Sequence, residues 1–313
     1  MNDSSLSRRE ALRSLAIAST LPLVSLGLGG CVSGSGPATA SVVSSPFGQM
    51  PDGRPVRLHT LRNPSGAIIA VSEYGATITS IRVPDRLGRC DNVVFGADSM
   101  DAYLRGLPAA SVIGRCANRI HRSRFMLDGR EFRVTPNEGE NHIHGGKEGF
   151  ASKLWSSRAW VEGGTAIAEF RYRSVDGEEG YPGNLDVTVT YAWNAQNELL
   201  ITYRAETDRA TVVNLTNHAY FNLAGAGNGD VLGHELQIQA QQYTPSDAAL
   251  IPTGQRASVV GTPLDFRDFH RIGDRIRDIR GPKGYDHNFV VDRRGGGLHL
   301  AARVIDPASG RTV

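Results

Sequence analysis

Cysteine is scarce in this sequence. Only Cys31, Cys90 and Cys116 are present, and their spacing matches no cysteine-based zinc site. Cys90 and Cys116 are able to pair in an oxidising compartment, but two separate thiols are the favoured interpretation.

Blocks of basic residues and helical periodicity are also missing. The formal net charge is only +2, which disfavours nucleic acid as a partner. No internal repeat is visible, and no segment of about a dozen residues carries apolar side chains at the 3.6-residue spacing of a helix. Hydrophobic residues nevertheless make up 40% of the chain, so it can bury a substantial core.

Alternation of apolar and polar residues is the main structural signal. It predicts strands at Ala76–Val83, Ala166–Tyr172 and Leu185–Trp193, and a hairpin in which Asn194–Asn197 turns the chain into Leu199–Ala205. Glycines and prolines punctuate these short runs. The pattern is typical of an all-β protein, a single large antiparallel β-sandwich.

The N-terminus is predicted to be an export signal, residues 1–31. Ser7–Arg13 matches a twin-arginine motif, and the apolar run Leu15–Gly30, broken by Pro22, is too short to remain as a membrane span. Two cleavage points compete. The lipobox-like Leu28–Cys31 leaves a lipidated Cys31, whereas Ala38–Ala40 releases a soluble protein; a cytoplasmic N-terminal helix is the disfavoured alternative.

The residues that follow the signal are rich in Ser, Gly, Pro and Ala. We therefore predict a flexible tether over 32–46 and a folded domain over 47–313. The expected location is outside the cytoplasm, either periplasmic or anchored through Cys31 on the outer side of the cytoplasmic membrane.

Two histidine segments carry the chemistry. Asn141–Gly146 and Thr216–Asn222 each place a histidine among amides, glycines or aromatics between predicted strands. Such residues suit a polar sugar pocket in which one histidine orients a hydroxyl and another moves a proton. Three more polar clusters occur, each of which taken alone reads as an ordinary turn, cap or surface pair: Gly114–Ile120, Asp176–Gly183 and Gly284–Phe289.

In this order the motifs resemble those of the aldose 1-epimerase (galactose mutarotase) family, from Phe47 to the C-terminus. The resemblance implies a galactose mutarotase-like supersandwich that interconverts the α and β anomers of free aldoses. It implies His218 as the general acid on the ring oxygen, and no metal or organic cofactor. His144 would hydrogen-bond the substrate near that oxygen, and sugar hydroxyls would be held by Asn118, Arg119 and Asp286.

One family feature has no match. The family's general base is a glutamate that follows a Ser-Gly-Arg stretch, and here Ser309-Gly310-Arg311 is followed by only two residues. Glu178 and Glu179 belong to a different loop. We therefore expect a sandwich that lacks its last strands, with core side chains uncovered and sheet edges unpaired, and little or no catalysis. A non-catalytic sugar-binding sandwich is the alternative function.

A metal-binding cupin is the remote alternative. His142, His144 and Glu148 match the first half of a cupin site, in which two histidines and a glutamate hold a divalent metal. The second half needs a histidine three residues after the glycine of Pro252-Thr253-Gly254. Ala257 occupies that position, so this interpretation is disfavoured.

Overall fold

The computed structural model describes residues 39–107, 110–279, 284–293 and 295–313. Strands dominate this part of the chain, and its one α-helix is α1 (Met100–Leu104). Within these residues no helix is both long and apolar enough to cross a membrane. Five short 3-10 turns complete the helical structure: η1 (His121–Ser123), η2 (Phe150–Ser152), η3 (Glu178–Gly180), η4 (Ile272–Asp274) and η5 (Ile276–Asp278).

One large sheet is antiparallel and follows the chain order. Its strands are β1 (Ser41–Gln49), β2 (Pro55–Arg62), β3 (Ile68–Ser72), β4 (Thr77–Pro84) and β5 (Cys90–Asn92). β4 agrees with the predicted strand at Ala76–Val83. A bulge between Ala70 and Val71 shifts the β3–β4 register by one residue.

The second large sheet is also an antiparallel meander. It runs through β11 (Ser156–Glu162), β12 (Thr165–Ser174), β13 (Leu185–Trp193) and β14 (Leu199–Thr207). Every second residue of β13 is buried, from Leu185 to Trp193. The predicted hairpin is confirmed, because Trp193 pairs with Leu199 across the turn.

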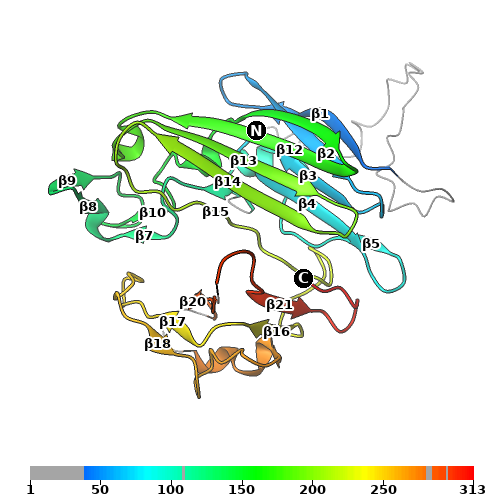
Figure 1. The fold of residues 1–313 in the computed structure, drawn as a ribbon. Helices are drawn as coiled ribbons and strands as arrows, with labels where there is room; N and C mark the ends of the chain where they lie inside the picture. The colour runs from blue at the N-terminus through cyan, green and yellow to red at the C-terminus, as the bar shows by residue number, and fades with distance from the viewer. Residues whose placement is uncertain (1–38, 108–109, 280–283, 294) are drawn as a thin grey trace, which may run out of the picture.

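The hydrophobic core lies between these two sheets. Its side chains include Ile69 and Ile78 from one sheet and Phe170, Val189 and Tyr191 from the other. In Figure 1 the green second sheet lies across the blue-to-cyan first sheet. The all-β sandwich prediction is confirmed, since alternating strands can bury one face only by packing it on another sheet.

Short strand pairs extend the sandwich on one side. β6 (Val112–Ile113) pairs with β15 (Thr216–Asn217), and β7 (Arg119–Ile120) pairs with β10 (His142–Ile143). A neighbouring hairpin consists of β8 (Arg124–Leu127) and β9 (Arg130–Arg133). These pairs bring the two predicted histidine segments to one region of the molecule.

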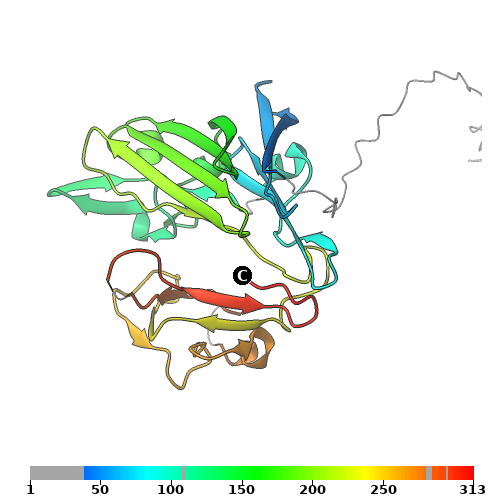
Figure 2. The same ribbon diagram turned by 45° about the vertical axis from the view of Figure 1, so that its right-hand side comes forward.

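The last part of the chain forms two three-stranded sheets below the sandwich, drawn yellow to red in Figures 1 and 2. Each sheet joins segments that lie far apart in the sequence. One contains β16 (Glu235–Ile238), β19 (His270–Arg271) and β21 (Ala302–Ile305). The other contains β17 (Gln242–Thr244), β18 (Ala257–Ser258) and β20 (Asn288–Val290).

A groove of about 670 Å³ opens beside β14 and the C-terminal residues. Ile81, Val93, Trp193 and Leu223, which belong to the core cluster, line it together with Val313. β14 is the last strand of its sheet in the described residues. The four core side chains that line the groove are themselves at most 7% exposed, so they stay buried along this edge of the sandwich.

The N-terminal boundary differs from the prediction. β1 begins at Ser41, so residues 41–46 of the predicted tether belong to the first sheet, ahead of the predicted domain start at Phe47. Strand pairing explains the difference, because Ser41 lies opposite Arg62 and Val42 packs against the core. Cys116 is a free thiol, so the Cys90–Cys116 disulfide does not form.

Candidate active site

Asn118 and His144 lie opposite each other at the open end of the β7–β10 ladder. The amide of Asn118 donates to Nδ1 of His144 over 3.0 Å, and the amide of His144 donates to the Asn118 carbonyl over 3.1 Å. Both residues have left-handed backbone conformations, with φ of 62° and 53°. Non-glycine residues adopt this region at an energetic cost and cluster at functional sites, so each loop holds the other in a strained form.

This contact fixes the protonation state of His144. Because Nδ1 accepts a hydrogen bond, the neutral imidazole carries its proton on Nε2. Burial lowers the pKa of His144, and the nearby charges of His218 and Arg119 lower it further, against the opposing effect of Glu138 and Asp286. His144 is therefore a neutral donor through Nε2.

His218 faces His144. Their ring centroids are 5.2 Å apart in an edge-to-face arrangement, and the ring of Tyr220 lies 5.0 Å from that of His218. The backbone of His218 is fixed on both sides, because its N–H donates to Ser111 O and its carbonyl accepts from the amide of Ala110, each over 3.0 Å. Besides burial, the proximity of His218 is one cause of the lowered pKa of His144.

Arg119 lies beside this pair and forms a two-pronged ion pair with Glu138. Its Nε and one terminal nitrogen donate to the carboxylate over 2.5 and 2.8 Å, and the other terminal nitrogen donates to Asn118 Oδ1 over 3.4 Å. The Arg119 side chain is only 13% exposed, so the pairing fixes its direction. Sequence reasoning missed Glu138, because the pair depends on the fold of the 135–141 loop.

Asp286 lies in the lower sheets, and only its charge connects it with the site. It precedes β20 and is exposed, and its charge acts on the pKa of His144. Its neighbours hold the segment: the Tyr285 ring lies 5.0 Å from Phe266, and the His287 ring lies 5.8 Å from Tyr243. The structure thus brings together four of the predicted pocket residues, Asn118, Arg119, His144 and His218, and links Asp286 to them only through its charge; Cys31 lies outside the described residues.

Glu178 and Glu179 are engaged elsewhere. Glu178 accepts hydrogen bonds from Tyr172 over 2.5 Å and from Ser174, and it forms an ion pair with Lys153 at 3.2 Å. Glu179 accepts backbone N–H groups of the loop that follows His144. Both carboxylates therefore support the loops around the site.

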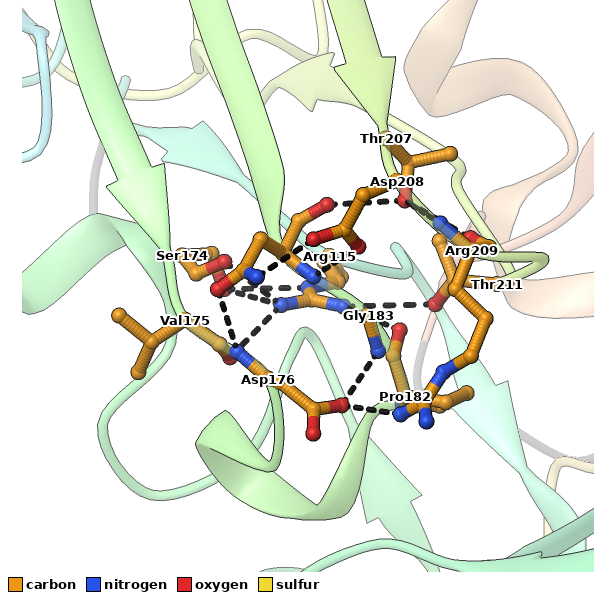
Figure 3. Close-up of polar contacts among 11 residues, drawn as sticks. Arg115, Ser174, Val175, Asp176, Pro182, Gly183, Thr207, Asp208, Arg209 and Thr211 are labelled. Carbon is orange, nitrogen blue, oxygen red and sulfur yellow. Dashed lines mark hydrogen bonds and ion pairs between the residues drawn. The ribbon is translucent and has the colours of Figure 1, made fainter.

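Arg115 is a second residue whose importance the sequence did not reveal. Its side chain is almost fully buried, and it donates to Ser174, Val175 and Pro182, and to Thr211 at the edge of this network (Figure 3). Among the described residues no carboxylate contacts it directly, and burial lowers its pKa. Only its burial distinguishes Arg115 from the many exposed arginines of this chain.

The cupin interpretation is wrong. His142 is fully buried, and its Nδ1 donates to the Thr135 carbonyl over 2.7 Å while its Nε2 accepts from the Tyr181 hydroxyl over 2.6 Å. Neither nitrogen is available to share a metal with His144. In the described residues no cluster of three or more His, Cys, Asp or Glu side chains is arranged to hold a metal ion.

Two facing imidazoles, a guanidinium and a carboxylate suit a ligand with several neighbouring hydroxyls and a proton to exchange. The aldose 1-epimerase family model matches residues 57–313. Human galactose mutarotase is 42% identical over 276 residues, 88% of this chain and 78% of that protein. Aldose 1-epimerase of Escherichia coli K12 is 41% identical over 258 residues, 81% and 73% of the two chains.

The fold agrees with these matches. A crystal structure of galactose 1-epimerase from Lactobacillus acidophilus superposes with a TM-score of 0.75 at 28% identity, over 85% of this chain and 77% of that one. The sandwich, the paired histidine segments and the family match over most of the chain lead to one assignment: this chain belongs to the aldose 1-epimerase family.

Proposed function

We propose that this protein interconverts the α and β anomers of free aldoses of the glucose or galactose type. The observation that carries the proposal is the edge-to-face pair of His144 and His218, beside Arg119 and within the electrostatic reach of Asp286. The relatives named galactose mutarotase and aldose 1-epimerase support the same reaction.

In the proposed reaction His218 donates a proton to the ring oxygen O5 of the sugar, while water takes the proton of the O1 hydroxyl and returns one to O1 when the ring closes. The C1–O5 bond breaks and C1=O1 forms. Rotation about C1–C2 and attack by the O5 hydroxyl on the other face of C1 then give the second anomer, and His218 recovers its proton. His144 stays neutral and donates from Nε2 to a sugar oxygen near O5.

Hydroxyl groups away from O5 are assigned to three residues. Arg119, oriented by Glu138, and Asn118 hold neighbouring hydroxyls on one side, and the Asp286 carboxylate accepts from hydroxyls on the other. Glu178 and Glu179 are committed to the loop contacts described above, so the proton of O1 is assigned to neither.

Polarimetry of freshly dissolved α-glucose or α-galactose tests this function. We expect the purified protein to speed the approach to anomeric equilibrium only modestly, because water rather than a carboxylate takes the O1 proton, and EDTA to leave the rate unchanged. A rate equal to that of buffer alone would contradict the proposal. If glucose still shifts the NMR signals of His144 in that case, the alternative of a non-catalytic sugar-binding sandwich takes its place.

We further propose export, with acyl anchoring through Cys31. The twin-arginine motif supports export, and the position of β1 supports the lipobox: Ala40, next to the alternative cleavage point, packs against the core, whereas Cys31 stands ten residues ahead of Ser41. Replacing Arg8 and Arg9 by Lys should retain the precursor in the cytoplasm. Cys31→Ala should release the protein from membranes, and membrane attachment of that variant would refute acylation.

A further inference from the structure

The loop that carries His144 is packed tightly against two other segments. A Cβ atom on Gly145 would lie 1.7 Å from the Gly114 carbonyl oxygen, and one on Gly146 would lie 2.1 Å from the Glu179 carboxylate. Both glycines also have left-handed φ angles, of 89° and 101°. No side chain fits at either position, so the two neighbouring segments determine the path of the chain after His144.

Glu179 is the side chain that holds this loop. Its two carboxylate oxygens accept the backbone N–H groups of Lys147, over 3.3 Å, and Glu148, over 2.8 Å. Hydrogen bonds to a charged acceptor are stronger than those between neutral groups. Glu179 itself has a left-handed φ of 51°, and its carbonyl accepts the amide of Thr135 over 2.9 Å.

Arg115 holds the segment on which Glu179 stands. Its guanidinium donates to the Ser174 carbonyl over 3.0 Å and to the Pro182 carbonyl over 2.9 Å, at the two ends of the Glu179 loop (Figure 3). Asp176 closes the same loop by accepting the Gly183 amide over 2.6 Å. Three residues after Arg115 comes Asn118, whose amide contacts His144.

These contacts form a closed circuit from Arg115 through the Glu179 loop and His144 back to Asn118. We propose that Glu179 is a positioning residue for the epimerisation, and that Arg115 supports it. Glu179 fixes the turn after His144, so that Nε2–H of this imidazole meets the sugar beside His218. This assignment rests on the proposed function and adds to it a residue that does not touch the substrate.

Glu179→Gln is the direct test. A glutamine amide can accept only one of the two backbone N–H groups cleanly, because its own NH₂ faces the other. We expect kcat/KM for glucose to fall by roughly 10- to 100-fold, the scale for a small misplacement of a binding group. Glu179→Asp retains the charge and should recover part of the loss, mainly in kcat. Glu198→Gln, on the distant β13–β14 turn, serves as the control and should match the wild type.

Lysine scarcity provides a readout that does not depend on activity. The sequence contains three lysines, Lys147, Lys153 and Lys283, so a protein labelled with ¹⁵N-lysine gives few backbone signals. We expect the Lys147 amide signal to move in Glu179→Gln and to stay in place in Glu198→Gln. An unchanged Lys147 signal together with wild-type kcat/KM would overturn the proposal.

A second result would also overturn the proposal. In it Glu179→Gln loses activity only in proportion to its loss of folded protein, and the Lys147 signal of the folded fraction does not move. If the wild type itself does not catalyse mutarotation, the proposed function fails. The Lys147 amide and the ring nitrogen signals of His144 then still report whether Glu179 sets this turn, because neither requires turnover.

Discussion

Two substitutions of His144 distinguish the roles of its two ring nitrogens. Asparagine places an acceptor where Nδ1 stands and removes the donor at Nε2. Glutamine places a donor near Nε2 and removes the acceptor that Asn118 contacts over 3.0 Å. We predict that His144→Asn loses activity without losing stability, and that His144→Gln loses stability while it keeps most of its activity.

The magnitudes follow from the contacts. The hydrogen bond from Asn118 joins neutral groups near the surface, so its loss in His144→Gln should lower the free energy of unfolding by about 0.5–1.5 kcal/mol. Asparagine adopts left-handed conformations readily, and the φ of 53° at this position should therefore suit His144→Asn. Loss of the Nε2 donor should lower kcat by roughly 10²–10³-fold, as removal of one donor to a developing oxyanion does.

Polarimetry and thermal unfolding of both variants form the assay. A stability change of 1 kcal/mol should appear as a change of about 2–4 °C in Tm for a domain of this size. The reasoning would be refuted if His144→Asn mutarotated glucose at the wild-type rate, or if both variants lost activity equally with the same Tm. Either result would mean that catalysis does not depend on the Nε2–H donor of His144.

Three further outcomes are expected. His218→Asn should lower the rate of anomer exchange by roughly 10²–10⁴-fold, the effect of removing a general acid, and near-normal turnover would move proton delivery to another group. Glu138→Gln should raise KM for glucose more than it lowers kcat, because it frees the Arg119 guanidinium, whereas Glu131→Gln on the neighbouring hairpin should change neither. Burial lowers the pKa of His59, His142 and His144 below the ordinary value of 6.5, so the unfolded chain binds more protons between the lowered values and 6.5. The stability that these three histidines contribute should thus be complete above pH 6.5 and should fall as the pH drops below it. A urea midpoint unchanged between pH 7.5 and 5.5 would contradict this.

The large sheets could be predicted because their strands carry local patterns. β13 alternates over its whole length, and the turn to β14 contains the residues that such turns prefer. β1 gave a weaker signal, since Ser and Gly interrupt it and its pairing with β2 determines its extent. The two-residue strands β7 and β10 gave none, because only long-range packing defines them.

In the site, too, the residues within sequence motifs could be predicted and those defined by long-range contacts could not. His144, His218, Arg119 and Asn118 could be found because their motifs resemble those of a family. Their partners could not, because the contact between Arg119 and Glu138 depends on a loop conformation. The burial of Arg115 likewise depends on segments around Ser174, Pro182 and Thr211 that meet it only in the folded chain. The sequence placed Glu178 and Glu179 in a different loop, and only the hydrogen bonds of the structure show which segments they hold.

The start of β1 at Ser41 also limits the distance between an anchored enzyme and its membrane. From an acylated Cys31 only ten residues lead to the edge of a folded sheet, and even a fully extended chain of that length spans at most about 33–36 Å. A tether that continued to Phe47 would allow roughly half as much again. In the acylated form the edge of the first sheet would remain within about 33–36 Å of the bilayer, so the sugars within reach would be those that pass close to the membrane surface.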